Sequence, residues 1–437
     1  MSERKMIYLC LAHMSENGME QKYVQEAFDT NWVVPMGPNV NGFENDLEGF
    51  VNCVGDSSLM LRMTAKGASK QLDRKVVCLS AGTAAVHLAL IACGVKAGDE
   101  VLVQSFTFCA SSHPITYLGA KPVFVDSERE TWNMDPELLE KAIVERKEVT
   151  GRYPKAIIPV ALYGMPYDCE RIMAIADKYG IPVIEDAAEG MGSRFNGQVL
   201  GTFGRFGVLS FNGNKMITTS GGGALICRSA EDANEVMWYA TQARDAYPYY
   251  EHTAIGYNYR MSNVCAGIGR GQMTVLDDHI AHHKHVQQLY RELLADVPGV
   301  TLHDQPADGR YDSNFWLCAA TLDPSVRIIG QENAYKEVIK TAVGGAAGVI
   351  KAVDSAVTDC QPNENVEALR VFMLEKKVEC RPVWKPMHKQ PVYADAVAYL
   401  NGVSEEIFKV GFCLPAGPYV TDEDVRYIVE CIKEAIA

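Results

Sequence analysis

The chain has 437 residues, of which 48% are hydrophobic and 22% are charged, and its formal net charge is −14. This composition is typical of a globular enzyme, and the length favours two domains over one. The negative charge argues against a protein whose main task is to neutralise nucleic-acid phosphates or an anionic membrane surface.

The N-terminal stretch MSERKMIYLCLAHMSENG is too short and too interrupted in its apolar part for a signal peptide, and no apolar run is long enough to span a membrane. Thirteen cysteines are scattered from Cys10 to Cys431 without a CxxC pair. That pattern is typical neither of a disulfide framework nor of a structural zinc site. We therefore expect a cytoplasmic protein that needs no membrane or nucleic-acid partner.

From about Lys75 to Arg228, short β-branched runs alternate with helical stretches, which is typical of an α/β fold with a mostly parallel, doubly wound sheet. Two helices are clear: residues 83–93 are apolar almost all round, and residues 169–179 are amphipathic. The expected strands are residues 76–79, 100–104, 121–125, 156–160, 182–185, 208–211 and 223–227.

After Gln272 the pattern changes to longer, charged helices, such as residues 286–294, followed by short mixed segments. The change predicts a large domain of residues 1–275 and a smaller α+β domain of residues 276–437. Stretches at about 55–73 and 328–363 interrupt the pattern and are interpreted as insertions. They could extend an interface, cover a site or bind a partner.

Three motifs place polar groups where strands end. In SAGTAAVHLAL a strand turns directly into a helix, whose free N–H groups could bind a phosphate, although small residues at such a turn can be purely structural. In PVIEDAAEG, Asp186 follows a strand, where it could pair with a protonated pyridine nitrogen or cap the next helix. In SFNGNK, Ser210 and Lys215 follow a third strand, and Lys215 has no acidic neighbour in sequence.

In this order the motifs resemble the DegT/DnrJ-type sugar-nucleotide aminotransferases, a family with the fold type I architecture of aspartate aminotransferase. The resemblance runs from NWVVPMGPNVNGFENDL to FCLPAGPYVTDEDV and leaves out the two insertions. It implies a pyridoxal 5′-phosphate (PLP) cofactor, glutamate as amino donor, and Lys215 as the Schiff-base lysine and proton carrier. It also implies that Asp186 binds the pyridine nitrogen.

The resemblance assigns further cofactor contacts. Ser210 would hold the cofactor phosphate together with the turn formed by Gly82, Thr83 and Ala84. Phe108 in SFTFCASS would stack on the ring, although core packing also explains an aromatic residue there.

The segment GYNYRMSNVCAGIG matches a family stretch that reaches the neighbouring subunit's site. The match implies a homodimer with active sites at the interface, in which Asn258 touches the cofactor phosphate. Arg260 would lie near the sugar nucleotide, or it could form an ordinary ion pair.

The chain also departs from the family pattern. Glu189 stands where many members have Gln or His, and it would face the ring hydroxyl with altered proton sharing. Ser220 stands where glycine is common. A dehydratase branch of the family replaces the lysine by His, so the intact Lys215 favours transamination.

The segment ECRPVWKPMHKQPVY supplies the candidate substrate residues Trp384, Lys385 and His388, although it could also be a proline-rich connection between lobes. It most resembles enzymes that aminate C4 of UDP-2-acetamido-2,6-dideoxy-4-ketoglucose for surface-glycan or glycoprotein sugars. Another UDP-, GDP- or dTDP-keto sugar, or a non-catalytic PLP-binding regulatory protein, remains an alternative.

Four histidines in DDHIAHHKHVQQLY have helical spacing. We expect a solvated helix face there and no metal site, because no open ligand set accompanies them.

Overall fold

The computed structural model describes residues 4–53, 72–336 and 358–436. Its centre is a sheet built from two four-stranded halves, ordered β14-β3-β2-β4 and β5-β8-β9-β1. Bridges from Ile157 to Val183 and from Val160 to Asp186 join the two halves between β4 and β5. The strands are β1 Lys75–Leu79, β2 Glu100–Gln104, β3 Lys121–Val125, β4 Ala156–Ile158, β5 Ile184–Asp186, β8 Phe206–Ser210, β9 Gly223–Cys227 and β14 Ala398–Tyr399.

Most neighbouring strands of this sheet are parallel, and β9 runs antiparallel to both β8 and β1. The expected strands are all present, with ends that shift by up to two residues. The helix expected at residues 169–179 is α6 Cys169–Tyr179, and the apolar helix expected at residues 83–93 is α3 Gly82–Ala92.

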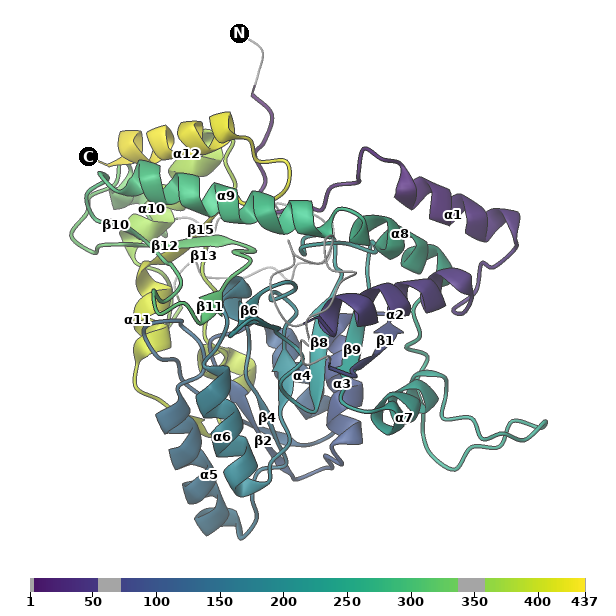
Figure 1. The fold of residues 1–437 in the computed structure, drawn as a ribbon. Coiled ribbons are helices and arrows are strands. Elements are labelled where there is room, and N and C mark those ends of the chain that lie inside the picture. The colour runs from purple at the N-terminus through teal and green to yellow at the C-terminus, as the bar shows by residue number, and fades with distance from the viewer. Residues whose placement is uncertain (1–3, 54–71, 337–357, 437) are drawn as a thin grey trace.

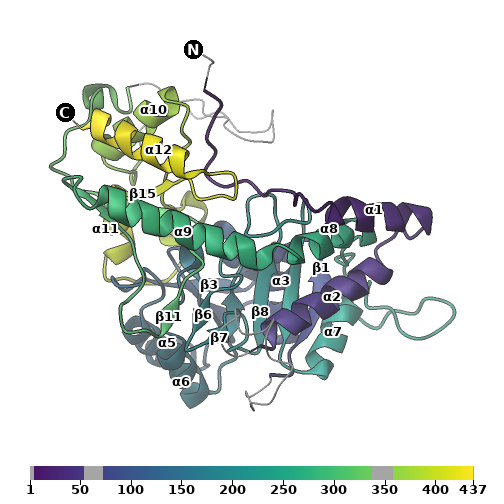
Figure 2. The same ribbon diagram turned by 45° about the horizontal axis from the view of Figure 1, so that its top comes forward.

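Helices cover both faces of the sheet (Figure 1, Figure 2). Alternate strand residues enter different hydrophobic clusters: Val76 and Cys78 pack in one, and Val77 and Leu79 in the other. The first cluster includes residues of α2 Pro38–Val51, α5 Pro136–Thr150 and α6. The second includes residues of α3, α4 His113–Tyr117 and α7 Ala230–Ala240. The predicted doubly wound, mostly parallel α/β sheet is therefore confirmed.

The C-terminal part of the chain forms an antiparallel sheet ordered β10-β12-β15-β13, with a third hydrophobic cluster shared with α9, α10 and α12. Its elements are β10 Val300–Leu302, β12 Cys318–Leu322, β13 Arg381–Pro382, β15 Gly411–Leu414, α9 Leu276–Leu294, α10 Glu364–Glu375 and α12 Asp422–Ala435. The same part also supplies strands to other sheets: β14 joins the central sheet, and β11 Tyr311–Asp312 pairs with β6 Arg194–Phe195, which pairs with β7 Gln198–Val199. The domain boundary at residue 276 stays a prediction.

The remaining long helices are α1 Met19–Asp29, α8 Asn263–Met273 and α11 Val403–Val410. Most of the first expected insertion (residues 55–71) and the centre of the second (residues 337–357) lie outside the described residues. Within the described part of the chain, no helix is both long and apolar enough to cross a membrane. All thirteen cysteines are free thiols.

The histidines of α9 correct one expectation from the sequence. Only His285 lies on a solvated face, where it contacts Asp422, whereas His279 and His283 are buried and contact the carbonyl groups of Met216 and Phe315. The helix is buried more deeply than its polar sequence indicated because its first turns pack on the first cluster and its later turns on the C-terminal cluster.

Candidate active site

A cavity of about 310 Å³ lies where β4, β5 and β8 end at their carboxyl termini, the edge at which ligands bind in open α/β sheets. Sequence segments far apart in the chain meet there. The predicted residues that line it are Gly82, Thr83, Phe108, Asp186, Glu189, Ser210, Lys215 and Trp384. Ala84 is buried in the first turn of α3, behind this lining.

The start of α3 and the end of β8 form one wall of the cavity. Ala81 caps α3 without any side-chain hydrogen bond, so the first N–H groups of the helix are open to a ligand. A Cβ atom on Gly82 would lie 3.2 Å from the Cβ atom of Ser210, so glycine allows this close approach. Hydroxyl and N–H donors therefore converge at a positive helix end, which is a favourable site for a phosphate.

Asp186 ends β5 and is 6% exposed. Its carboxylate accepts a hydrogen bond of 2.6 Å from the Ser111 hydroxyl and one of 3.1 Å from the Ala188 N–H group. Burial raises the pKa of Asp186, while the hydrogen bonds and the charge of Lys215 oppose the rise. Such a carboxylate is suited to a cationic ligand group.

Lys215 follows β8 in a tight turn, and its side chain is 14% exposed. Its Nζ lies 3.4 Å from Oε1 of Glu189 and 4.1 Å from the centre of the Trp316 ring. The Trp316 indole also donates a 2.6 Å hydrogen bond to the carbonyl of Asn214, which fixes the loop beside the lysine. The amine is thus held at the cavity by a carboxylate and an aromatic face.

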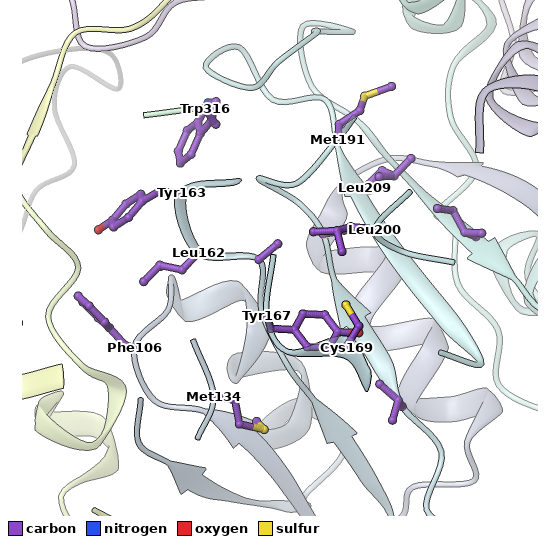
Figure 3. Packing of buried hydrophobic residues seen from close by; sticks show 14 of the residues in the cluster. Phe106, Met134, Leu162, Tyr163, Tyr167, Cys169, Met191, Leu200, Leu209 and Trp316 are labelled. Atoms are coloured by element: carbon purple, nitrogen blue, oxygen red, sulfur yellow. The ribbon is translucent and has the colours of Figure 1, made fainter. Parts of the chain in front are cut away.

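Glu189 links this amine to the opposite wall. Its second oxygen accepts a 2.8 Å hydrogen bond from the N–H group of Tyr163, and burial raises its pKa against the opposing charge of Lys215. Tyr163 has a left-handed backbone with φ 55°, and its hydroxyl accepts a 2.8 Å hydrogen bond from the N–H group of Trp384. Figure 3 shows Tyr163 and Trp316 at one end of the buried cluster.

Phe108 and Trp384 form the aromatic wall. The Phe108 ring is 49% exposed and lines the cavity, and its centre lies 5.3 Å from that of Trp384. Exposure of this size indicates a ring that is free to pack against a ligand, in contrast to the core-packing alternative.

Other predicted residues lie away from this cavity. Lys385 lines a neighbouring cavity of about 340 Å³, beyond Phe108 and Trp384, and its Nζ is 3.6 Å from Asp359. His388 does not line either cavity: its side chain is 5% exposed, and its ring nitrogens contact Ser105 and Glu405. A direct substrate contact by His388 is therefore not supported, because both ring nitrogens already have partners.

Asn258 and Arg260 also lie outside the cavity of their own chain. Asn258 is exposed and bridges to Thr241. The largely buried guanidinium of Arg260 donates to both carboxylate oxygens of Glu44 and to the carbonyl of Cys78. The structure thus favours the ion-pair alternative for Arg260, because its donors are engaged within the chain.

The sequence reading missed several residues that complete the site. Ser111 and Thr107 lie in the SFTFCASS motif already singled out for Phe108, and its run of hydroxyl residues was the available signal. Trp316 and Tyr163 carried no local signal, because they reach the site only through tertiary packing.

The family model of the DegT/DnrJ/EryC1/StrS aminotransferases matches residues 66–342 and 345–433. The chain belongs to this family. It is 39% identical to EpsN of Bacillus subtilis (strain 168), named as a pyridoxal phosphate-dependent aminotransferase, in an alignment that covers 98% of this chain and 95% of EpsN. It is 32% identical to a GDP-perosamine synthase of Escherichia coli O157:H7, with coverage of 98% and 99%.

The fold comparison agrees with the family match. A crystal structure of a DegT/DnrJ/EryC1/StrS aminotransferase from Brucella abortus is similar, with a TM-score of 0.77, 25% identity and coverage of 96% of this chain and 95% of that one. The protein is accordingly a PLP-dependent aminotransferase with the fold type I architecture.

The residues present fit PLP. The start of α3 with Ser210 offers donors for a phosphate, the buried Asp186 carboxylate calls for a cationic partner such as a protonated pyridine nitrogen, and Lys215 presents an amine to the same cavity. These three groups, phosphate donors, a carboxylate and an amine, differ in chemistry, as the three parts of the cofactor that they would bind do.

Proposed function

We propose that this aminotransferase moves an amino group from glutamate to C4 of a nucleotide-linked 4-keto-6-deoxy sugar, UDP-2-acetamido-2,6-dideoxy-4-ketoglucose. The observation that carries the proposal is the meeting of Lys215, Asp186 and the Gly82–Ser210 wall in one cavity. A product of this kind would serve the synthesis of surface glycans or glycoproteins.

Bound PLP supplies an electron sink for the carbon that gains or loses a proton. Lys215 would bind the cofactor through Nζ and, once released by the amino donor, would carry that proton as a general acid-base. Asp186 would hold the pyridine nitrogen in its charged form, and Glu189 would orient the Lys215 amine from 3.4 Å. Ser210 with the first turn of α3 would bind the phosphate, while Phe108 would pack on the ring.

Absorption spectra test the catalytic part. PLP added to the protein should produce the visible band of lysine-bound cofactor, which glutamate removes and the keto sugar restores. Lys215→Ala should abolish turnover yet still bind PLP noncovalently, whereas Lys178→Ala, at an exposed lysine paired with Glu140, should behave as wild type. Absence of the band in wild-type protein would overturn the assignment of Lys215.

The identity of the sugar is tested by competition among nucleotide-linked keto sugars. The resemblance of RPVWKPMH supports a UDP-linked 4-keto sugar, while the GDP-perosamine synthase relative supports a GDP-linked one. Restoration of the spectrum by the GDP sugar alone would replace the proposed substrate and keep the aminotransferase.

Trp384 and Lys385 are the proposed acceptor-side residues, since they line the main cavity and its neighbour respectively. Lys385→Ala should raise KM for the keto sugar and leave the glutamate half-reaction unchanged. An unchanged KM would remove Lys385 from the acceptor site.

A non-catalytic regulatory protein that retains PLP is the alternative from another class. It requires no turnover, so formation of 2-oxoglutarate from glutamate, in an amount equal to the cofactor, would rule it out. Binding of PLP without any 2-oxoglutarate would support it.

We further propose a cytoplasmic homodimer in which Asn258 completes the partner's site. The free thiols suit a reducing compartment, and exposed apolar side chains at Trp32, Val33 and Met36 suit an interface. Co-expressed Lys215→Ala and Asn258→Ala chains should recover activity at about a quarter of the wild-type sites, because one site of each hybrid is intact. No recovery would place Asn258 in its own chain's site, and full activity of the Asn258→Ala chain by itself would place it outside any site. Cell fractionation tests the location.

A further inference from the structure

A chain of buried hydroxyl groups runs into Asp186. The Thr107 and Ser111 hydroxyl oxygens lie 2.8 Å apart, and the Ser111 hydroxyl lies 2.6 Å from Oδ2 of Asp186. Thr107 and Ser111 are each 1% exposed. Both hydroxyl residues are thus largely shielded from bulk water.

The direction of donation follows from counting protons. An ionised carboxylate only accepts hydrogen bonds, so Ser111 must give its single hydroxyl proton to Asp186. Thr107 must then donate its own proton to Ser111. The chain is directed, and both donors favour the ionised form of Asp186.

Asp186 depends on these donors because the other groups around it partly oppose and partly favour its negative charge. Burial disfavours its charge, the negative charge of Glu189 repels it, and Lys215 attracts it without forming an ion pair with it. Ala188 supplies the other hydrogen bond, from its N–H group. Within the described residues, Ser111 is thus the one side chain that donates to this carboxylate.

We infer that Ser111, oriented by Thr107, is a positioning residue that keeps Asp186 ionised and aimed at the pyridine nitrogen of the cofactor. The inference rests on the proposed function of Asp186. Ser111 and Thr107 do not touch the substrate in this scheme. They set the charge of the Asp186 carboxylate, which contacts the cofactor.

Ser112 provides a matched control. It is the adjacent serine and is fully buried, but its hydroxyl donates to the carbonyl of Cys109 at 3.2 Å and makes no contact with Asp186. Removing either serine hydroxyl deletes one buried oxygen from the same segment, so a general structural effect should appear in both variants.

The test measures equilibrium binding of pyridoxamine 5′-phosphate to cofactor-free protein as a function of pH, followed by tryptophan fluorescence. This probe cannot bond to Lys215, so its affinity reports the pairing of its pyridine nitrogen with Asp186. Titration of the probe's own phosphate is common to all variants and cancels in their comparison.

Ser111→Ala should weaken binding at neutral pH by about tenfold or more, the effect of losing a hydrogen bond to a charged group. It should also move the acid-side loss of affinity to higher pH, because Asp186 then accepts a proton more readily. Thr107→Val should lower the affinity and raise the pH of its acid-side loss as well, but by less than Ser111→Ala does. Ser112→Ala should match wild type in both quantities.

Two results would overturn the inference: a Ser111→Ala profile that coincides with that of Ser112→Ala, or a lowered melting temperature with an unshifted pH profile. If wild-type protein does not bind the probe at all, the proposed cofactor site fails instead. The two failures are therefore distinguishable.

Discussion

Glu185 and Asp186 are adjacent at the end of β5 but face opposite sides of the central sheet. Glu185 accepts hydrogen bonds from the N–H groups of Gly201, Phe203 and Gly204, at 2.9, 2.6 and 2.7 Å. Among the described residues, Asp186 accepts from Ser111 and Ala188 alone, and it opens to the cavity.

The difference shows how similar buried carboxylates acquire distinct roles. Three backbone donors hold Glu185, so it fixes the loop at residues 201–204. Asp186 has capacity left for a ligand, and this incomplete satisfaction costs stability in the cofactor-free protein. Substitutions on the two sides should therefore separate folding from function.

Asp186→Asn should give the largest effect. Turnover should fall on the order of 10²-fold, because an amide cannot hold the pyridine nitrogen in its charged form. The melting temperature of the cofactor-free variant should stay equal or rise, since a buried charge is removed. Steady-state kinetics measure the turnover and thermal unfolding measures the melting temperature. An unchanged turnover rate would remove Asp186 from the site.

Glu185→Gln should mainly destabilise the protein. The amide group turns N–H donors toward the loop and leaves a buried backbone N–H group unsatisfied, at a cost of about 1–3 kcal/mol in the free energy of unfolding. Urea unfolding measures the loss, and the folded variant should bind pyridoxamine 5′-phosphate as wild type does. Impaired binding without destabilisation would contradict the comparison.

The pH dependence of stability should differ between wild type and Asp186→Asn. Burial raises the pKa of Asp186 above its ordinary value of 3.8, so its protonated form favours folding. That contribution is complete below 3.8 and is lost as pH rises through the folded pKa, at about 1.4 kcal/mol per pKa unit. The free energy of unfolding of the cofactor-free protein should fall more steeply with rising pH in wild type than in Asp186→Asn. Parallel curves for the two proteins would refute a raised pKa of Asp186.

His283 should give an effect of opposite sign. Burial lowers its pKa from 6.5 to about 3, so its neutral form favours folding. Its contribution is present above pH 6.5 and is lost as pH falls toward about 3. His283→Gln should flatten the acid side of the stability curve, whereas His285→Gln, at an exposed position, should not; equal curves for the two variants would exclude a role for His283.

The sequence by itself determined the parts that depend on local pattern. Alternating β-branched runs predicted the strands, and the order of SAGT, EDAAE and SFNGNK placed Gly82, Asp186, Ser210 and Lys215 at strand ends that a parallel sheet brings to one edge. These residues could be predicted because topology, and no particular side-chain contact, brings them together.

Only the tertiary structure decided which partners those residues have. Ser111 reaches Asp186 across 75 positions, and Arg260 is engaged by Glu44 across 216, contacts for which no local pattern exists. The burial of His283, which contacts the Phe315 carbonyl, likewise depends on packing with residues distant in sequence. Burial and long-range hydrogen bonds set the charge of a side chain and its freedom to bind, and both arise only when distant segments pack together.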